Sequence, residues 1–346
     1  MKQYLSALLY IICSVALLLH TGSAVQRERY QNPEREGIEI LSGAADELRD
    51  DPAAYATGET RETGTVAPSV TPGQKTPSAR ITGTDAESQT PDESEIPENI
   101  RLIAHRGYTI SAPENTLPAF EAAALAGYDC IETDVRFTSD GTAVLLHRPV
   151  VDDTSNGTGE IADMTLIQAR CLDFGARRGE EYAGTRIPTL EEGLAFCRGL
   201  ELDVYLELKV PEMTPEQYQI VDHIVKDCGM RDHVTFISFY LVCLEGMAAQ
   251  DTGYHFRFLT SSRDIETRHE SNDVSVKTAM EYFWSIQETA GSVGISWNYT
   301  RLTPELAEEV KTAGLVLEAW TVDDIKALQA IPASCAAVTT DMITNS

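Results

Sequence analysis

Glu132 and Asp134 form the clearest candidate for a chemical site in this chain of 346 residues. Both follow a mainly apolar run that ends at Ile131, and they stand two positions apart. Because side chains alternate along a strand, the two carboxylates point to the same face, about 7 Å apart along the backbone. Carboxylates that close repel each other unless a cation or a proton joins them. The pair therefore indicates a binding site rather than an ordinary surface.

Ionisable residues also end three other apolar runs. His105 and Arg106 follow the first, and His147 follows the second. Glu207 and Lys209 end the third, where they share one face of a strand-like segment. Parallel α/β barrels place catalytic residues at the C-terminal ends of their strands, and the four runs fit that arrangement.

The three carboxylates of Glu132, Asp134 and Glu207 are hard oxygen ligands with no cysteine among them. Such donors suit Ca²⁺ or Mg²⁺ better than zinc. The alternative is a set of salt bridges to Lys209 and Arg106. Three acids at strand ends favour the divalent cation.

His105 and His147 are the candidate general base and general acid. The unperturbed pKa of histidine is about 6.5, so one imidazole can accept a proton and the other donate one near neutral pH. The chain has seven histidines. His223, His233 and His269 stand in helix or loop contexts without convergent acids, which leaves His105 and His147 as the pair of interest.

The segment that positions these residues is 99–346, whose 248 residues are close to the ~250 typical of one eight-stranded α/β barrel. Strand-like and helix-like runs alternate through it. The predicted strands cover residues 101–105, 129–135, 142–147, 202–208, 234–239, 255–260, 293–297, 315–321 and 336–340. The predicted helices cover residues 115–126, 189–198, 215–228, 240–250, 275–289, 303–313 and 323–330. The predicted fold class is therefore α/β, a distorted (β/α)8 barrel of the TIM type.

The sequence contains nine strand candidates, one more than an eight-stranded barrel needs. Asp140-Gly141 joins the second and third by a tight turn, which predicts an antiparallel hairpin and one irregular strand. The loop-rich stretch 148–186 predicts a small insertion after the third strand, beside the barrel mouth. Thr189, Thr303 and Thr321 are predicted helix N-caps, and Asn115 is a reasonable N-cap after Pro113-Glu114.

A series of short motifs runs through the chain in order. They are HRG (105–107), PENT (113–116), IETDVRFTSDGTAVLLH (131–147), TSNGTG (154–159), IPTLEEGL (187–194), ELK (207–209), SF (238–239), WTVD (320–323) and TTD (339–341). By these motifs the chain resembles the glycerophosphodiester phosphodiesterase family, over Arg101 to Asp341. A lone HRG motif is weak evidence, but ordered matches at family-like spacing are specific.

The resemblance implies metal-dependent hydrolysis of glycerophosphodiesters to an alcohol and glycerol 3-phosphate. In the family the substrate's own hydroxyl attacks the phosphorus, and water then opens the cyclic phosphate. The resemblance makes His105 and His147 the catalytic pair. It assigns Arg106 and Lys209 to the phosphate and Trp320 to the glycerol moiety, although a core aromatic is the alternative for Trp320. Glu114 is a supporting residue of the substrate site.

Two positions depart from the family pattern. Arg148 follows the second histidine where the family usually has Asp, and Asp153 stands where the family has Arg. The two changes swap opposite charges, which is consistent with a reversed ion pair. They could instead mark altered specificity or lost activity. A cation beside His147 lowers its pKa, and the pH optimum would then shift downward.

The N-terminal part carries different predictions. Residues 1–24 resemble a secretory signal peptide, cleaved near Ala24 or retained as an anchor. Residues 25–98 are rich in Thr, Pro, Ser and acids, which predicts a disordered acidic linker. Together they predict a secreted or cell-surface enzyme, with possible membrane proximity.

The formal charge of −27 argues against nucleic acid as a partner. The resemblance implies a small-molecule glycerophosphodiester as the ligand. Without Cys13, six cysteines remain, and we expect mostly buried thiols. A lysophospholipid or a cell-wall glycerol-phosphate polymer is an alternative substrate, and a non-catalytic binding domain is a further alternative. The oligomeric state is left open.

Overall fold

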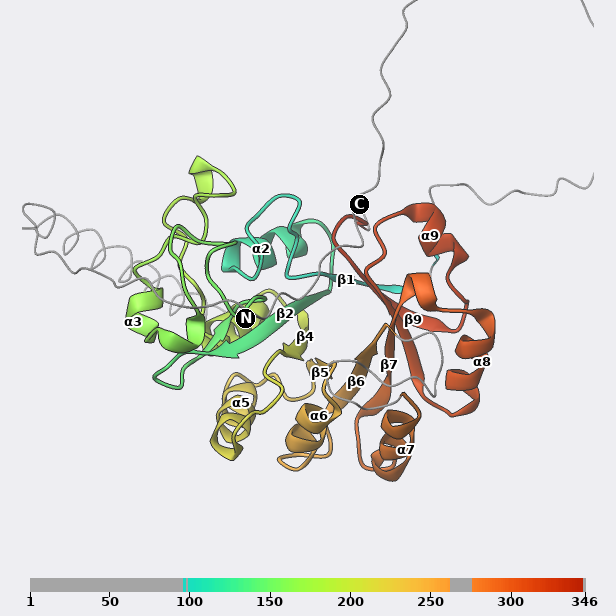
Figure 1. Ribbon diagram of the computed structural model, residues 1–346. Helices are drawn as coiled ribbons and strands as arrows, with labels where there is room; N and C mark the ends of the chain where they lie inside the picture. The colour runs from blue at the N-terminus through green and yellow to red at the C-terminus, as the bar shows by residue number, and fades with distance from the viewer. Residues whose placement is uncertain (1–95, 98, 262–275, 345–346) are drawn as a thin grey trace, which may run out of the picture. The chain divides into compact units, whose positions relative to one another are not determined.

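A computed structural model of the chain describes residues 96, 97, 99–261 and 276–344 (Figure 1). The predicted signal segment 1–24 and the predicted linker up to residue 95 lie outside the described residues. Within the described part, no helix combines the length and the apolar character that crossing a membrane requires.

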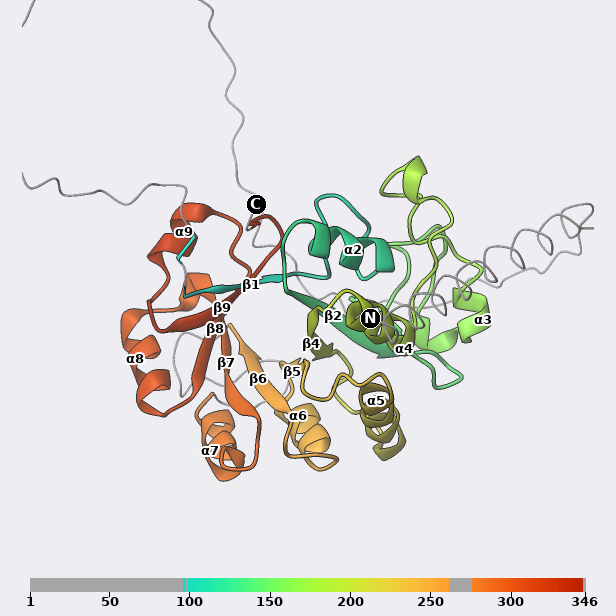
Figure 2. The same cartoon turned by 180° about the vertical axis from the view of Figure 1, so that it is seen from behind.

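Within the described residues, eight parallel strands close into a barrel, and this confirms the predicted fold class (Figures 1 and 2). The strands are β1 (Arg101–Ala104), β2 (Cys130–Phe137), β4 (Asp203–Leu208), β5 (Val234–Ser238), β6 (His255–Thr260), β7 (Ser292–Asn298), β8 (Val316–Trp320) and β9 (Cys335–Thr340). Neighbours pair in chain order from β4 to β9, and β1 closes the ring by pairing with both β9 and β2.

The ninth strand candidate is the irregular one. β3 (Ala143–Leu145) pairs antiparallel with β2 and stands outside the ring of eight. The turn between them depends on Gly141, whose φ of +79° suits glycine and whose N–H donates to the Thr138 carbonyl at 3.0 Å. The predicted hairpin is therefore present, and the chain needs it to place His147 beside β2.

Helices cover the outside of the strands (Figures 1 and 2). They are α2 (Leu117–Leu125), α4 (Leu190–Gly199), α5 (Pro215–Asp227), α6 (Leu241–Ala248), α7 (Val276–Ile286), α8 (Pro304–Thr312) and α9 (Ile325–Ala330). Thr189 caps α4 through a reciprocal capping box with Glu192, and Thr303 caps α8. The prediction for Thr321 is wrong, because the side chain of Asp324 accepts from Ala327 N–H and caps α9 instead.

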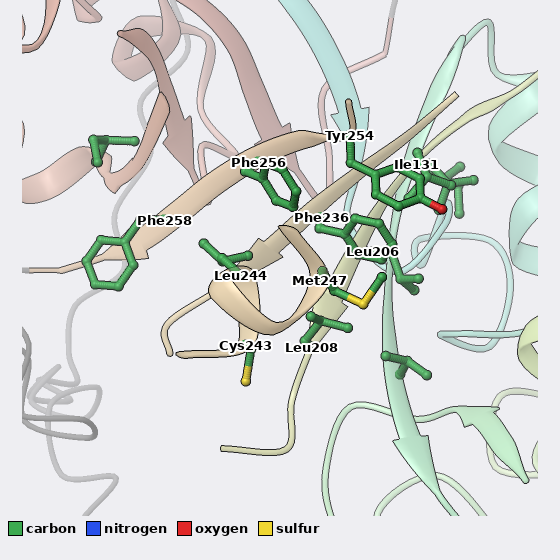
Figure 3. Packing of buried hydrophobic residues seen from close by; sticks show 14 of the residues in the cluster. Ile131, Leu206, Leu208, Phe236, Cys243, Leu244, Met247, Tyr254, Phe256 and Phe258 are labelled. Atoms are coloured by element: carbon green, nitrogen blue, oxygen red, sulfur yellow. The ribbon is translucent and has the colours of Figure 1, made fainter. Parts of the chain in front are cut away.

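Two layers of apolar side chains follow from the alternation of the strands. In β4, Leu206 and Leu208 belong to the large core shared with the helices, whereas Tyr205 belongs to a small cluster with Ile103, Ile237 and Leu259 from other barrel strands. Figure 3 shows Leu244 and Met247 of α6 packed near Leu206 and Phe236. Burying such a side chain contributes about 1.5–3 kcal/mol, so the helices are held mainly by this outer layer.

The insertion after β3 has a small core of its own. It contains η1 (Ile161–Asp163), α3 (Leu166–Ala169) and η2 (Glu180–Tyr182), as the loop-rich composition of 148–186 predicts. Its buried apolar residues are Val144, Leu146, Val151, Ile161, Ala169, Phe174 and Ile187. Because this cluster includes Leu146, it anchors the insertion directly beside His147.

Candidate active site

The three predicted metal ligands come together at the C-terminal ends of two neighbouring strands. Asp134 on β2 is paired with Glu207 on β4 in the parallel ladder. Glu132 lies two residues before Asp134 in β2, so its side chain points to the same face. Candidate ligand oxygens of the three carboxylates all lie within 4.8 Å of one another, and all three residues are buried. Among the described residues, Glu132 Oε1 is buried with no hydrogen-bond partner. An unsatisfied carboxylate oxygen facing two more is a donor set that fits a hard divalent cation.

The predicted alternative of salt bridges is also present. Lys209 Nζ lies 2.7 Å from Glu207 Oε2 and 3.1 Å from Asp134 Oδ1. Arg106 Nε lies 3.6 Å from Asp134 Oδ2, and its Nη1 donates to Glu114 at 3.2 Å and 3.3 Å. The two cations hold the carboxylates together without satisfying Glu132 Oε1, so salt bridges and a cation site coexist.

The pKa values of the three carboxyls diverge because Asp134 has Lys209 and Arg106 close to it, whereas the negative charge of Asp134 acts on Glu132 and Glu207. Burial, with the charges of Asp134 and Glu207, raises the pKa of Glu132 well above its ordinary value. Burial also raises the pKa of Glu207, against the opposing charge of Lys209. Burial opposes ionisation of Asp134 too, but Lys209, His147 and Arg106 lower its pKa below the ordinary range. Asp134 is therefore the ionised centre of the cluster.

The HRG segment turns directly after β1. Arg106 has a φ of +57° and its backbone N–H donates to Glu132 Oε2 at 3.0 Å. Gly107 has a φ of +81°, and a Cβ on it would lie 2.7 Å from the Ala119 Cβ. Only glycine fits there, because α2 packs against this turn. The local sequence thus aims Arg106 at the carboxylates.

Asn115 is a site residue, and its prediction as a helix N-cap is wrong. The N-cap position of α2 is Thr116, while Asn115 has a φ of +55°. Its Nδ2 donates to Asp134 Oδ2 at 2.8 Å, and its Oδ1 accepts from Asp134 N at 3.1 Å and Thr133 Oγ1 at 2.6 Å. Asn115 therefore orients Asp134, and only its position after Pro113-Glu114 signalled it in the sequence.

His105 follows β1 and faces two acids through its two ring nitrogens. Nδ1 lies 2.9 Å from Asp341 Oδ1, and Nε2 lies 3.9 Å from Glu132 Oε2. Asp341 follows β9 in the TTD segment, which sequence reasoning matched without giving it a role. The ring therefore has one edge toward Asp341 and the other toward the carboxylate cluster.

His147 lies beside the cluster as predicted. The Leu146 N–H donates to the Asp134 carbonyl at 3.0 Å, and Arg136 Nε donates to the His147 carbonyl at 2.8 Å, a contact that sequence reasoning missed. Burial lowers the pKa of His147 to about 3, with Lys209 and Arg106 adding to the effect against Asp134. Without a ligand, the His147 imidazole is therefore neutral at pH 7.

Arg148 and Asp153 form the reversed ion pair that their swapped charges predict, with Nε and Oδ2 3.2 Å apart. The expectation that Arg148 lowers the pKa of His147 is not supported, since burial and the cations Lys209 and Arg106 are the main lowering causes. The physical reason is that Arg148 is compensated by Asp153 and 63% exposed, so water screens its charge.

A cavity of about 310 Å³ joins these groups at the barrel mouth. Its lining includes the ionisable residues His105, Arg106, Glu132, His147, Glu207 and Lys209, together with Ile237, Phe239, Leu259, Trp320, Thr321 and Thr339. Trp320 meets Phe239 edge to face, with ring centroids 5.4 Å apart, and its Nε1 donates to the Ser296 carbonyl at 3.0 Å. Glu114 does not line the cavity and reaches it through Arg106. The site thus combines charged side chains with apolar ones in a single cavity.

Two other features lie away from this chemistry. Arg257 Nε and Glu318 Oε1 are 2.6 Å apart inside the barrel, and Tyr205 donates to the same Oε1 at 2.8 Å. A groove of about 810 Å³ runs along α7 and α8, where four glutamates and the exposed Trp284 line it. Neither feature contains a histidine, so the chemistry concentrates in the smaller cavity.

Comparisons with known proteins point to one enzyme family. The model of the glycerophosphoryl diester phosphodiesterase family matches residues 105–345. A glycerophosphodiester phosphodiesterase of Caldanaerobacter subterraneus subsp. tengcongensis is 31% identical over 223 residues, which span 64% of this chain and 85% of that protein. Glycerophosphodiester phosphodiesterase 1 of Homo sapiens is 42% identical over 114 residues, or 32% of this chain and 34% of that protein.

Solved structures are similar as well. A glycerophosphodiester phosphodiesterase from Agrobacterium tumefaciens has a TM-score of 0.55 and 26% identity, covering 70% of this chain and 96% of that one. An Oleispira antarctica phosphodiesterase in complex with the product sn-glycerol-3-phosphate has a TM-score of 0.60 and 24% identity, covering 71% and 93%. The second likeness bears on the fold alone.

Proposed function

Because the chain belongs to the glycerophosphoryl diester phosphodiesterase family and is an enzyme of it, we propose the reaction that its site performs. The proposed reaction is hydrolysis of a glycerophosphodiester to an alcohol and glycerol 3-phosphate. One observation carries it: a single cavity is lined by two histidines, two cations, apolar side chains and two members, Glu132 and Glu207, of the buried three-carboxylate cluster. The carboxylates can hold a cation, the cationic side chains can bind the phosphate, and the histidines can transfer protons.

In this proposal Glu132, Asp134 and Glu207 hold a divalent cation, Ca²⁺ or Mg²⁺. Their all-oxygen donor set and the unpartnered Glu132 Oε1 support this assignment. When bound, such a cation neutralises charge on a phosphate oxygen as the transition state forms.

The proposed steps use the substrate's own hydroxyl. One histidine removes the proton of the glycerol hydroxyl, whose oxygen attacks phosphorus, while the other protonates the departing alkoxide. Water then opens the cyclic phosphate with the two histidines in exchanged roles, which returns both protons. Intramolecular attack benefits from effective molarities up to ~10⁵–10⁸ M in well-oriented systems. The neutral state of His147 without ligand fits a proton acceptor, and a bound phosphodiester anion would raise its pKa by offsetting Lys209 and Arg106.

Substrate positioning falls to the remaining residues of the cavity. Arg106 presents a guanidinium able to hold phosphate oxygens bidentately, and Lys209 adds a point charge. Trp320, braced by Phe239, supplies an apolar surface for the glycerol carbons. Glu114 holds the Arg106 guanidinium in place.

A lysophospholipid is the second candidate substrate, and one observation favours it. Ile110 and Met342 are large apolar side chains, 43% and 57% exposed. Ile110 follows β1 and Met342 follows β9, and these strands are neighbours in the barrel. Both loops leave the C-terminal ends of their strands, so the two side chains stand at the end of the barrel that carries the site, where an acyl chain would arrive.

Export completes the proposal. We propose that residues 1–24 direct the chain out of the cell and that 25–98 act as a spacer before the barrel domain at 99–346. Cell fractionation of the full chain against a variant lacking 1–24 tests this, and equal distribution of the two would contradict it.

The decisive experiment measures hydrolysis of glycerophosphocholine, glycerophosphoglycerol and a lysophospholipid by the full chain, with Ca²⁺, Mg²⁺ or EDTA. His105→Ala is the test variant. His223→Ala is the matched control, because His223 is an exposed helix residue paired only with Asp227 at 3.1 Å. We expect turnover that needs a divalent ion and His105 but not His223. Turnover in EDTA or by His105→Ala would refute the mechanism.

A further inference from the structure

We propose that Asp341 is the positioning residue of His105, fixing the imidazole so that Nε2 alone exchanges protons with the substrate. The inference rests on the proposed function and adds a residue to it. Asp341 Oδ1 lies 2.9 Å from Nδ1 on one edge of the ring, while Nε2 on the other edge lies 3.9 Å from Glu132 Oε2. The ring thus spans from Asp341 to the carboxylate cluster.

Asp341 is itself held in place by the chain around it. Its backbone N–H donates to Asp323 Oδ1 at 2.7 Å, and the Thr340 hydroxyl donates to the same oxygen at 3.1 Å. Thr109 Oγ1 donates to Asp341 Oδ1 at 3.3 Å. The backbone at Asp341 is therefore held independently of His105, and Thr109 adds a bond to the carboxylate itself.

The backbone of His105 is tied to the same strand. Its N–H donates to the Thr340 carbonyl at 3.0 Å, in continuation of the ladder between β1 and β9. His105 and Asp341 therefore lie side by side, because they follow the adjacent strands β1 and β9. The motif TTD (339–341) matched the family pattern, but the sequence alone assigned no role to its last residue, Asp341. The contact with His105 supplies one.

The contact with Asp341 determines which nitrogen of the His105 ring carries the hydrogen. Burial opposes ionisation of Asp341, but the hydrogen bond and charge of His105 lower its pKa, so it is a carboxylate at neutral pH. An ionised carboxylate only accepts hydrogen bonds, so Nδ1 must carry the hydrogen. Nε2, on the edge that points toward the carboxylate cluster, is then left without the hydrogen. No carboxylate of the described residues pairs in this way with His147, so the two histidines are held differently.

Asp341→Leu in the full chain tests the inference, because leucine has a similar size and no acceptor. The loop should keep its fold, since the bonds to Asp323 use the Asp341 backbone and Thr340. We expect kcat to fall roughly 10²-fold with KM nearly unchanged, at the lower end of what general acid–base catalysis supplies. Nitrogen-15 NMR of the histidine ring, assigned by comparison with His105→Ala, should show loss of the Nδ1–H form.

Asp341→Asn and Asp232→Asn complete the test. Asp341→Asn is isosteric and keeps the fold even if leucine does not, and we expect at least a tenfold loss in kcat because a neutral amide cannot stabilise a protonated ring. Asp232→Asn is the control, since Asp232 forms an exposed 2.8 Å pair with Arg231 before β5, at the opposite end of the strand from the site. Wild-type kcat in Asp341→Asn, or an unchanged ring tautomer in Asp341→Leu, would overturn the inference. A wild-type enzyme inactive on every substrate would instead refute the proposed function, and the NMR result would still decide the role of Asp341.

Discussion

Replacing Glu132 by glutamine should reduce the loss of stability that the metal-free protein suffers as pH rises. Burial and two neighbouring carboxylates raise the pKa of Glu132 well above its ordinary value of 4.5. A carboxyl with a raised folded-state pKa stabilises the fold only while it is protonated. Stability is therefore fully present below the unfolded-state pKa and is lost as pH rises toward the folded-state pKa.

The magnitude follows from linkage. Between its two pKa values the contribution of Glu132 falls by about 1.4 kcal/mol per pH unit, which is roughly 3–6 °C in Tm for a domain of this size. The raised pKa of Glu207 and the lowered pKa of His147 act in both proteins, so the difference between wild type and Glu132→Gln isolates this contribution. The lowered pKa of Asp134 does not interfere, because its stabilising effect is complete above its unfolded-state pKa of 3.8 and is lost only at lower pH. Glu132→Gln removes one titrating group, so its metal-free stability should decline less with pH.

A divalent cation should stabilise the wild type much more than Glu132→Gln. Saturation at about 100 times Kd adds roughly 2.7 kcal/mol, or about 5–10 °C in Tm, to the wild type. Glu132→Gln should gain little, because the unpartnered Oε1 is no longer a carboxylate oxygen. Thermal melts from about pH 5 to pH 8 in EDTA, then with Mg²⁺ or Ca²⁺, measure both effects, with the exposed Glu121→Gln on α2 as control. Equal pH slopes in wild type and Glu132→Gln, or equal gains from the cation, would refute the reasoning.

Three further predictions concern other parts of the site. Lys209→Met should cost about 3–5 kcal/mol of unfolding free energy in EDTA, because two buried carboxylates lose their partner, and Mg²⁺ should restore part of it; an unchanged urea midpoint would contradict this. Arg148→Ala should change stability by less than about 1 kcal/mol and leave the pH dependence of kcat/KM in place, because the pair with Asp153 is exposed; an upward shift of the acid limb would show that Arg148 does act on His147. Trp320→Ala should raise KM roughly tenfold, since an aromatic contact with the substrate contributes about 1–2 kcal/mol. The control Trp284→Ala on α7 should leave KM unchanged. Equal KM values for the two variants would remove Trp320 from the substrate site.

The fold was predictable because its signals are local and repeated. Each barrel strand is a short apolar run, and β1 begins and β5 begins where the predicted runs begin. Gly141 marks the hairpin because the turn needs a positive φ. Thr321 misled for the opposite reason: it stands near a helix start, but the cap is decided by which side chain reaches the N3 amide, and Asp324 does so.

The site was predictable where a charged residue ends a strand and unpredictable where a partner comes from elsewhere in the chain. Glu132 and Glu207 stand out by their spacing alone. Asp341 contacts His105 across 236 positions, so no local pattern connects them. Arg257 and Glu318 lie in the middle of apolar strands, and only barrel closure makes them partners. Long-range pairing of this kind depends on strand order, which the residue pattern does not contain.

The charge of the cluster explains why a cation and an anionic substrate belong to the same cavity. Glu132, Asp134 and Glu207 carry one more negative charge than Lys209 and Arg106 offset, so a phosphodiester anion is repelled from the metal-free site. A divalent cation reverses that sign and leaves one positive charge for one phosphodiester group. Without a metal, the cluster reduces its excess negative charge by protonation, as the raised pKa values of Glu132 and Glu207 indicate. Protons and metal therefore compete for the same oxygens, and the affinity for Mg²⁺ or Ca²⁺ should rise from mildly acidic to neutral pH. Calorimetric titration at the two ends of that range would measure it, and a pH-independent affinity would place the cation elsewhere.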